Sequence, residues 1–349
     1  MERSALRESA SKVIEFEEAV KDFFGVKHAI TVNSWTSGLT AAVGALEIEP
    51  GDEVICPSWT YVATAEAAAI LGLIPVMCDV DPETFNVTAD YIEPLITKKT
   101  KAIVPVHLYG QSCEMESILN LAKKYNLKVV EDNAQAIGCK YTFKNGKKKS
   151  TGTIGDIGTT SFYPSKNLGA YGDGGAIFTN NDELADKIFL AANHGQNKRY
   201  HHKIIGCNSR LDSIQAEILN IKLKHLNEYN SNRQIMAKNY DISFHNIDMI
   251  QTPHIIKNSS HVYHQYTLKI LDGRRDKLKE YLSENNIPSM IYYPIPLYKQ
   301  EAFKKYAKED FRLKNTEELS KNVISLPIHT EIENSNQDYI IENVLNFFK

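Results

Sequence analysis

Short apolar runs alternate with amphipathic stretches through the first half of the chain, from residue 26 to residue 178. Nearly continuous apolar runs are typical of strands buried on both faces of a parallel sheet, and helical spacing between them predicts the connecting helices. The pattern therefore predicts strand–helix–strand units and an α/β fold. The predicted strands are 28–32, 53–56, 74–78, 101–107, 128–131, 159–162 and 176–179, and the clearest predicted helices between them are 36–47, 61–71 and 115–125.

The pattern of apolar and polar residues changes after residue 208. Residues 211–244 carry apolar side chains at helical spacing, which predicts one or two long helices that connect two domains. Predicted strands at 263–270 and 289–293 and predicted helices at 274–286 and 336–348 indicate a smaller α+β domain. We therefore divide the chain into a large domain, residues 1–225, and a small C-terminal domain, residues 226–349.

Composition excludes several classes of protein. The 349 residues include 40 Lys and Arg against 43 Asp and Glu, so we expect no nucleic-acid partner; the basic run at 144–149 predicts an exposed hairpin tip. No apolar stretch approaches the about 20 residues that span a membrane, and the N-terminus lacks a secretory signal. Five cysteines form no Cys-x-x-Cys pair, and no zinc spacing occurs. We expect a cytoplasmic protein with no membrane segment and no metal site.

One predicted strand leads into Lys166, which is followed by a glycine-rich segment that ends at Gly175. Glycine lets the backbone adopt positive φ or approach a ligand closely. A lysine beside such a segment can act as a nucleophile if burial lowers its pKa. Considered alone, an exposed lysine in a glycine-rich turn explains this segment equally well.

Asp132 emerges from the carboxyl end of an apolar strand, where parallel sheets bind their ligands. A carboxylate at this place can keep the pyridine nitrogen of pyridoxal phosphate protonated. An Asp that starts a turn or caps a helix is the more frequent case.

Residues 33–38, Asn-Ser-Trp-Thr-Ser-Gly, join a strand to a helix. Hydroxyls and backbone N–H groups at a helix N-terminus can cradle a phosphate, although an ordinary N-cap is the better explanation of this segment alone. The chain has neither a G-x-G-x-x-G nor a Walker A motif, so the main sequence evidence for binding of NAD or a nucleoside triphosphate is missing. Phosphate cradle, strand-end Asp and glycine-flanked Lys, in this order on one sheet, are together what pyridoxal phosphate requires.

From residue 23 to residue 349 the sequence resembles the DegT/DnrJ/EryC1/StrS family of sugar aminotransferases. The motifs that carry the resemblance are Pro-Gly-Asp-Glu-Val at 50–54, Thr-Tyr-Val-Ala-Thr at 60–64, Val-His-Leu-Tyr-Gly-Gln at 106–111, Glu-Asp-Asn-Ala-Gln at 131–135, the segment 161–175, and Asn-Ser-Arg-Leu-Asp at 208–212. The resemblance implies the type I fold of pyridoxal-phosphate enzymes. That fold has a large domain with a mostly parallel seven-stranded sheet flanked by helices and a smaller C-terminal α+β domain.

The resemblance also implies roles for individual residues around a pyridoxal 5'-phosphate cofactor. Lys166 would bond to the cofactor and Asp132 would pair with its pyridine nitrogen. Tyr61 would stack on the ring and Gln135 would lie by its phenolic oxygen. The remaining implied contacts are Thr36, Ser37 and Ser161 to the phosphate, Asn208 to the phosphate from a partner subunit, and Arg210, Tyr292 and Tyr293 to the substrate.

A residue from a partner subunit implies a homodimer with shared active sites. Arg210 would reach the substrate from that same partner, and a salt bridge at the start of a helix is the alternative for it.

Two features depart from the family pattern. Trp35 stands where the family usually has Gly, and it either alters access to the site or packs beneath the loop. The N-terminal arm is shorter than usual, which puts its substrate contacts in doubt.

We therefore expect a pyridoxal-phosphate-dependent aminotransferase that moves an amino group from L-glutamate, the donor implied by the family, to a nucleotide-linked keto-sugar. The forms of segments 164–175 and 208–212 favour a 3-keto-6-deoxy dTDP-sugar or a 3-keto UDP-sugar over a 4-keto sugar. The product would be an amino sugar for surface polysaccharide such as the O-antigen of lipopolysaccharide. Lys166 argues against the branch of dehydratases that have histidine there, and a non-catalytic protein that binds pyridoxal phosphate is the remaining alternative.

Overall fold

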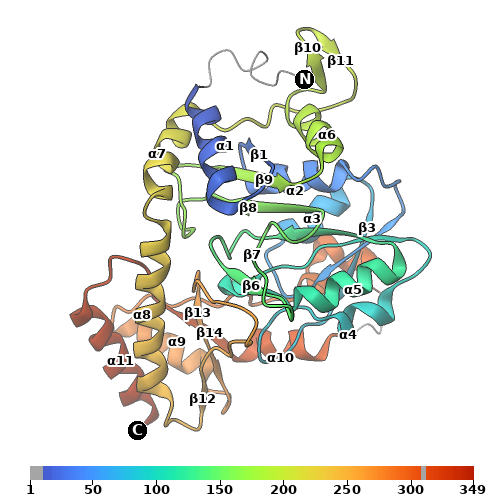
Figure 1. Ribbon diagram of the computed structural model, residues 1–349. Helices are drawn as coiled ribbons and strands as arrows, with labels where there is room; N and C mark the ends of the chain where they lie inside the picture. Colours follow the sequence, from blue (N-terminus) through green and yellow to red (C-terminus); the bar gives the residue numbers. More distant parts are fainter. Residues whose placement is uncertain (1–10, 308–311) are drawn as a thin grey trace.

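The computed structural model describes residues 11–307 and 312–349 (Figure 1). Residues 1–10, at the predicted short N-terminal arm, lie outside the described residues. Within the two described ranges, no helix combines the length and the apolar character that crossing a membrane requires.

A seven-stranded sheet forms the centre of the larger part of the molecule, as predicted. Only one strand, β9, runs against the others: it pairs antiparallel with both of its neighbours, and all remaining pairs are parallel. In spatial order the strands are β1 (His28–Val32), β9 (Gly175–Thr179), β8 (Ile157–Ser161), β5 (Lys128–Asp132), β4 (Thr100–Ile103), β2 (Glu53–Pro57) and β3 (Ile74–Cys78).

Helices cover both faces of this sheet because alternate strand residues point to opposite sides. In β2, Val54 and Cys56 pack in the cluster with helices α2, α3 and α6, whereas Ile55 packs with α5. Helices α1 and α7 cover the β1–β9 end of the second face. The bounds of these helices are α1 (Ser11–Phe24), α2 (Trp35–Gly44), α3 (Ala63–Ile70), α4 (Ala89–Ile92), α5 (Met115–Tyr125), α6 (Asp182–Ala192) and α7 (Ser213–Leu223).

The C-terminal part is built on a small antiparallel sheet. The predicted stretch 211–244 forms two helices, α7 and α8 (Leu226–Phe244), and Figure 1 shows α8 running from the large sheet down to the C-terminal helix α11. The other elements here are β12 (Ile250–Gln251), β13 (Tyr266–Ile270), α9 (Arg275–Glu284), α10 (Lys314–Asn322), β14 (Val323–Leu326) and α11 (Asn334–Phe348). The helix α8 begins directly after the predicted boundary at residue 225. Its first residue, Leu226, packs with α1 and α7, whereas Phe244 packs with β13 and α11, so α8 contacts both parts and the boundary stays a prediction.

Three predicted strands differ from the structure. The strand predicted at 263–270 begins only at Tyr266. Strand 101–107 ends at Ile103, and the chain turns into the 3-10 helix η3 (Leu108–Gly110), because Pro105 has no N–H and both Tyr109 and Gly110 have positive φ. The predicted strand 289–293 is wrong: Met290 alone pairs, with Ser325 of β14.

The remaining elements are short. Two prolines after residue 293 lead the chain back to the large sheet, where the 3-10 helices η4 (Leu297–Lys299) and η5 (Glu301–Tyr306) begin. The predicted hairpin around 144–149 is confirmed as β6 (Lys140–Thr142) and β7 (Lys148–Ser150). The 3-10 helix η2 (Glu93–Leu95) and a second hairpin, β10 (Gln196–Lys198) and β11 (His201–His202), were not predicted.

A fully buried carboxylate, Glu131, fixes the carboxyl end of the central strand β5. It accepts backbone N–H groups of Gly152 at 2.8 Å, Ile154 at 2.6 Å and Gly155 at 2.7 Å. His107 Nε2 lies 2.8 Å from Glu131 Oε2, the oxygen that also accepts from Gly152. Because His107 Nδ1 accepts the N–H of Cys113, Nε2 carries the proton and donates. Four donors therefore hold one anion at the strand end.

We predict that Glu131→Gln destabilises the protein by about 2 to 4 kcal/mol, because the new amide N–H₂ must face N–H donors such as that of Gly152. Chemical denaturation measures this loss. Glu318→Gln on the exposed side of α10 is the matched control and should change the free energy of unfolding by less than about 0.5 kcal/mol. Equal stability of the two variants would contradict the inferred network.

Candidate active site

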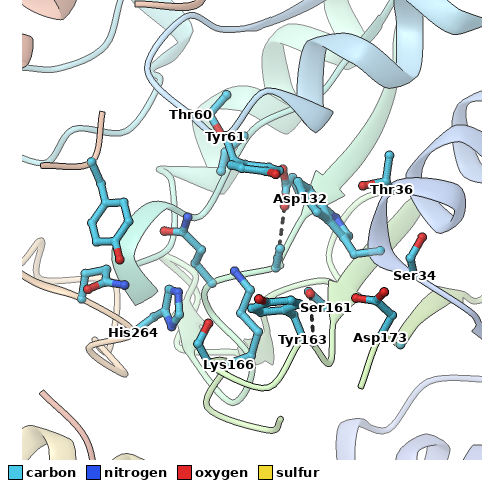
Figure 2. A pocket seen from close by; sticks show the side chains of 18 of the residues that line it. Ser34, Thr36, Thr60, Tyr61, Asp132, Ser161, Tyr163, Lys166, Asp173 and His264 are labelled. Carbon is cyan, nitrogen blue, oxygen red and sulfur yellow. Dashed lines mark hydrogen bonds between the residues drawn. The ribbon is translucent and has the colours of Figure 1, made fainter. Parts of the chain in front are cut away.

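A cavity of about 480 Å³ opens at the carboxyl ends of β5 and β8, beside the N-terminus of α2. Figure 2 shows Ser34, Thr36, Ser161 and Asp173 gathered at one end and His264 at the other, with Lys166 between them. The predicted residues that line this cavity are Thr36, Tyr61, Asp132, Gln135, Ser161, Lys166, Tyr292 and Tyr293. Segments far apart in the sequence therefore meet at one place.

Asp132 ends β5 and is buried. Its Oδ2 accepts a hydrogen bond from Thr64 Oγ1 at 2.8 Å and its Oδ1 accepts the N–H of Ala134 at 3.1 Å, so the turn predicted as the alternative also exists. Burial raises the pKa of Asp132 to about 6, although these hydrogen bonds and the positive charge of Lys166 oppose the rise. Asp132 is a carboxyl group that a nearby cation can readily ionise.

Lys166 points into the cavity from the loop after β8 (Figure 2). Burial lowers its pKa to about 8, and the carboxylate of Asp132 opposes this shift. The alternative of an exposed lysine in a turn is therefore not supported. A lysine with this pKa can lose and regain a proton near neutral pH.

The N-terminus of α2 forms one end of the cavity. Ser34 is the N-cap, and its side chain accepts the N–H of Ser37 at 3.2 Å, as the capping explanation predicts. Thr36 and Ser161 face the cavity beside this helix end. A Cβ on Gly175 would lie 2.8 Å from the backbone nitrogen of Trp35, so β9 can approach the helix end only with glycine there. The result is a ring of hydroxyls and N–H groups suited to a phosphate.

Trp35 both packs beneath the loop and lines the cavity. Its ring is 7% exposed, and its Nε1 donates to Thr159 Oγ1 of β8 at 3.2 Å. The ring centroid lies 6.2 Å from that of Tyr61, which is half exposed and borders the cavity. Trp35 thus replaces the usual glycine with a fixed wall beside Tyr61.

Gln135 connects the large domain to the C-terminal part of the site. Its Oε1 accepts the N–H of Tyr109 at 2.7 Å, and its Nε2 donates to the hydroxyl of Tyr293 at 3.0 Å. The hydroxyl of Tyr109 in turn donates to the carbonyl oxygen of Tyr292. These bonds hold Tyr292 and Tyr293 at the cavity although their segment is not a strand.

Three predicted residues do not line the cavity. Ser37 Oγ donates to Asn33 Oδ1 at 2.5 Å within the start of α2. Asn208 and Arg210 are exposed. Within the described residues the Arg210 side chain has no ion pair or hydrogen bond, so the salt bridge that was the alternative for it is absent there. Between them, Ser209 Oγ donates to Asn33 Oδ1 at 2.8 Å and anchors the segment beside α2.

Several residues of the site were missed by the sequence analysis. Thr64, which bonds Asp132, lies in the first turn of α3, three residues after Tyr61, and could have been found from its place in the motif 60–64. The cavity residues Ser34, Thr60, Tyr163 and Asp173 lie in segments that the sequence analysis singled out without giving these residues a role, whereas His264 and Gln265 lie outside those segments. Nothing in the local sequence marks His264 and Gln265, because they reach the site through pairing of distant segments.

Comparison with known proteins agrees with this architecture. The model of the DegT/DnrJ/EryC1/StrS aminotransferase family matches residues 1–345. The "Pleiotropic regulatory protein" of Geobacillus stearothermophilus is 41% identical over 97% of this chain and 89% of its own length. The "UDP-2-acetamido-2-deoxy-3-oxo-D-glucuronate aminotransferase" of Pseudomonas aeruginosa is 43% identical over 96% of this chain and 90% of its own length.

Solved structures share the same fold. S. venezuelae DesV, determined in complex with a ketimine intermediate, has a TM-score of 0.93 to this chain at 33% identity. The match covers 99% of this chain and 93% of that chain. The family resemblance and the fold class expected from the motifs are confirmed.

We predict that acetic anhydride acylates Lys166 of the cofactor-free protein at a rate that rises through pH 8 and then levels off. At a pKa of about 8 half of the amines are neutral at pH 8, against less than about 1% at the ordinary value of 10.5. Peptide mass spectrometry measures the rate, with exposed Lys277 as the internal reference. A rate for Lys166 that still climbs at pH 10 would contradict the lowered pKa.

Proposed function

Because the chain belongs to the DegT/DnrJ/EryC1/StrS aminotransferase family, whose members depend on pyridoxal phosphate, we propose that it aminates a nucleotide-linked keto-sugar. One observation carries the proposal: a buried strand-end carboxyl, Asp132, and a lysine of lowered pKa, Lys166, share a cavity with a helix N-terminus. The residues present fit the cofactor, since Thr36, Ser161 and the N-terminus of α2 form one end of the cavity that Asp132 and Lys166 line.

The chain's own groups divide the work of holding the cofactor. Thr36, Ser161 and the N-terminus of α2 would bind the phosphate, with Tyr61 against the ring. Asp132 would become ionised beside the protonated pyridine nitrogen, because the attraction of that cation offsets the cost of burying a charged carboxylate. Pyridoxal phosphate, when bound, supplies an electron sink for negative charge on the substrate carbon.

Lys166 would serve as the nucleophile that holds the cofactor and as the base that moves the substrate proton. At pH 7 a pKa of about 8 leaves about a tenth of such amines neutral and able to accept a proton. The protonated Nζ can then return the proton in the reverse direction. Tyr292 and Tyr293 close the cavity on the side of the C-terminal domain and would contact the substrate.

For the substrate we favour a 3-keto UDP-sugar or 3-keto-6-deoxy dTDP-sugar, with L-glutamate as amino donor. Support comes from the Pseudomonas relative, whose name specifies a 3-oxo UDP-sugar, and from the motif forms at 164–175 and 208–212. A 4-keto sugar is the alternative acceptor. Because the Geobacillus relative is named as a regulatory protein, a non-catalytic role is the second candidate. An amino sugar of this kind would serve surface polysaccharide synthesis.

We propose that the enzyme acts as a homodimer in which Asn208 and Arg210 complete the site of the partner subunit. Both side chains are exposed and lie outside the cavity of their own chain. Large apolar side chains near them are also exposed: Ile205 is 97% exposed and Ile214 and Tyr171 are each 74% exposed. An apolar surface of this kind is typical of a protein–protein interface.

We predict that L-glutamate converts the purified enzyme from its pyridoxal form to its pyridoxamine form, with loss of the visible absorbance band. Lys166→Ala should lower turnover by at least about a thousandfold, because no other group replaces both of its functions. Lys277→Ala on the exposed face of α9 is the matched control.

A 3-keto UDP-sugar or dTDP-sugar should then restore the visible band, and 4-keto sugars test the alternative acceptor. A band that no amino donor changes would support the non-catalytic candidate. Normal turnover of Lys166→Ala would falsify the assignment of the lysine.

The shared site predicts complementation between two inactive variants, Lys166→Ala and Arg210→Ala. In a mixed dimer, the subunit that keeps Lys166 receives Arg210 from its partner, so one of the two sites is intact. Random pairing makes half of the dimers mixed, and about a quarter of the wild-type activity should return. Activity no higher than that of the separate variants would show that Arg210 acts within its own chain.

A further inference from the structure

His264 is a further ionisable group in the cavity that Lys166 lines. It lies in the segment 261–265 just before β13, in the C-terminal part of the chain, and its residue is 6% exposed. Figure 2 shows its ring next to Lys166, at the end of the cavity opposite Ser34 and Thr36. The transamination chemistry described above gives this imidazole no role.

The imidazole of His264 has no hydrogen bond within the described residues. Its Nδ1 is enclosed by protein atoms and has no partner. An enclosed N–H without an acceptor costs more than a bare lone pair, so we assign the proton to Nε2. Since the residue lines the cavity and its enclosed nitrogen is Nδ1, the Nε2–H is the donor available to a ligand.

A close backbone contact places His264 at this position. Gly110, at φ +111°, lies so near the segment that a Cβ there would be 2.8 Å from the nitrogen of Tyr263 and 3.0 Å from that of His264. The N–H of Val262 donates to the carbonyl of Gly110 at 2.9 Å, and that of Gln265 to the carbonyl of Tyr109 at 3.3 Å. Only glycine allows the two segments to pair this closely.

A buried guanidinium holds the same segment from the other side. Arg233 of α8 donates through Nη1 to the carbonyl oxygens of Tyr263 at 3.0 Å, His264 at 3.5 Å and Ile328 at 2.9 Å. Burial, and then the charges of Lys166 and Arg233, hold the pKa of His264 well below its ordinary value. The ring is therefore neutral, its backbone is held on the segment 262–265, and one N–H donor is free.

We propose that His264 is a substrate-binding residue whose Nε2–H donates a hydrogen bond to an oxygen of the substrate beside Lys166. The inference rests on the proposed function, because it assigns a residue to the substrate side of that site. The oxygen belongs either to the carboxylate of the amino donor or to a hydroxyl of the keto-sugar. Both are acceptors for the same N–H, and separate half-reactions distinguish them.

His261 is a matched control on the same segment. It is also a histidine with 6% exposure, but it does not line this cavity. Its Nδ1 accepts the N–H of Tyr263 at 3.0 Å, and the two rings stack with centroids 4.0 Å apart. It therefore contributes to the structure of the segment without reaching the substrate.

The test compares His264→Phe, His264→Gln and His261→Phe in the holoenzyme, with L-glutamate and a 3-keto UDP-sugar as separate substrates. For His264→Phe we expect the KM of one substrate to rise by about 10-fold to 100-fold, with kcat within about threefold, because a bond made throughout the reaction is lost. His264→Gln, which keeps an N–H donor, should recover most of this loss. The substrate whose KM rises identifies the oxygen.

Melting and cofactor titration give readouts that do not depend on turnover. His264→Phe removes no hydrogen bond within the protein, so the melting temperature of its cofactor-free form should stay within about 2 °C of wild type. His261→Phe loses an acceptor and should melt about 2 to 5 °C lower with unchanged KM values. Both variants should bind pyridoxal phosphate with a Kd within about threefold of wild type.

Unchanged KM values in His264→Phe, or equal impairment of His264→Gln and His264→Phe, would overturn the proposal. Weaker cofactor binding that accounts for the whole loss would also overturn it, because His264 would then act on the cofactor. A wild-type enzyme that reacts with no donor and no keto-sugar would instead overturn the proposed function, together with this inference.

Discussion

The carboxyl end of β5 is held by the anion of Glu131, and the geometry of the site depends on that restraint. Three backbone N–H groups and His107 converge on one buried carboxylate, so the strand end cannot move without exposing several donors. The next residue, Asp132, faces the opposite side because side chains alternate along a strand. The restrained carboxylate of Glu131 on one side of the sheet thus fixes the position of Asp132 on the other side, and Asp132 is the group whose protonation can change.

Asp132 and Lys166 show how burial prepares two groups for opposite tasks. Burial disfavours charge on both, which raises the pKa of the acid to about 6 and lowers that of the amine to about 8. Each charge also favours the other, and this mutual attraction limits both shifts. The pKa values of both groups therefore lie near neutral pH, and the binding of a cationic ring and a phosphate can determine whether each group is charged.

Much of the fold and part of the site could be predicted from the sequence. Strand-end placement is a local property, and it located Asp132 and Lys166 correctly at one edge of the sheet. The strand predicted at 289–293 failed because the pattern does not show that the chain returns to the large sheet. The place of His264 in the site could not be predicted for a similar reason, because it depends on pairing of its segment with Gly110, about 150 residues earlier in the chain. The role of Arg210 stays a prediction, since it depends on a second subunit.

The two sides of the cavity come from different parts of the chain. The phosphate cradle, Asp132 and Lys166 belong to elements of the large sheet, whereas His264, Tyr292 and Tyr293 come from the C-terminal part. With the roles proposed above, substitutions in the second group would change which acceptor fits without altering the groups that bind the cofactor. Such a separation gives the architecture a simple route to new substrates, because specificity can diverge while the shared chemistry is conserved.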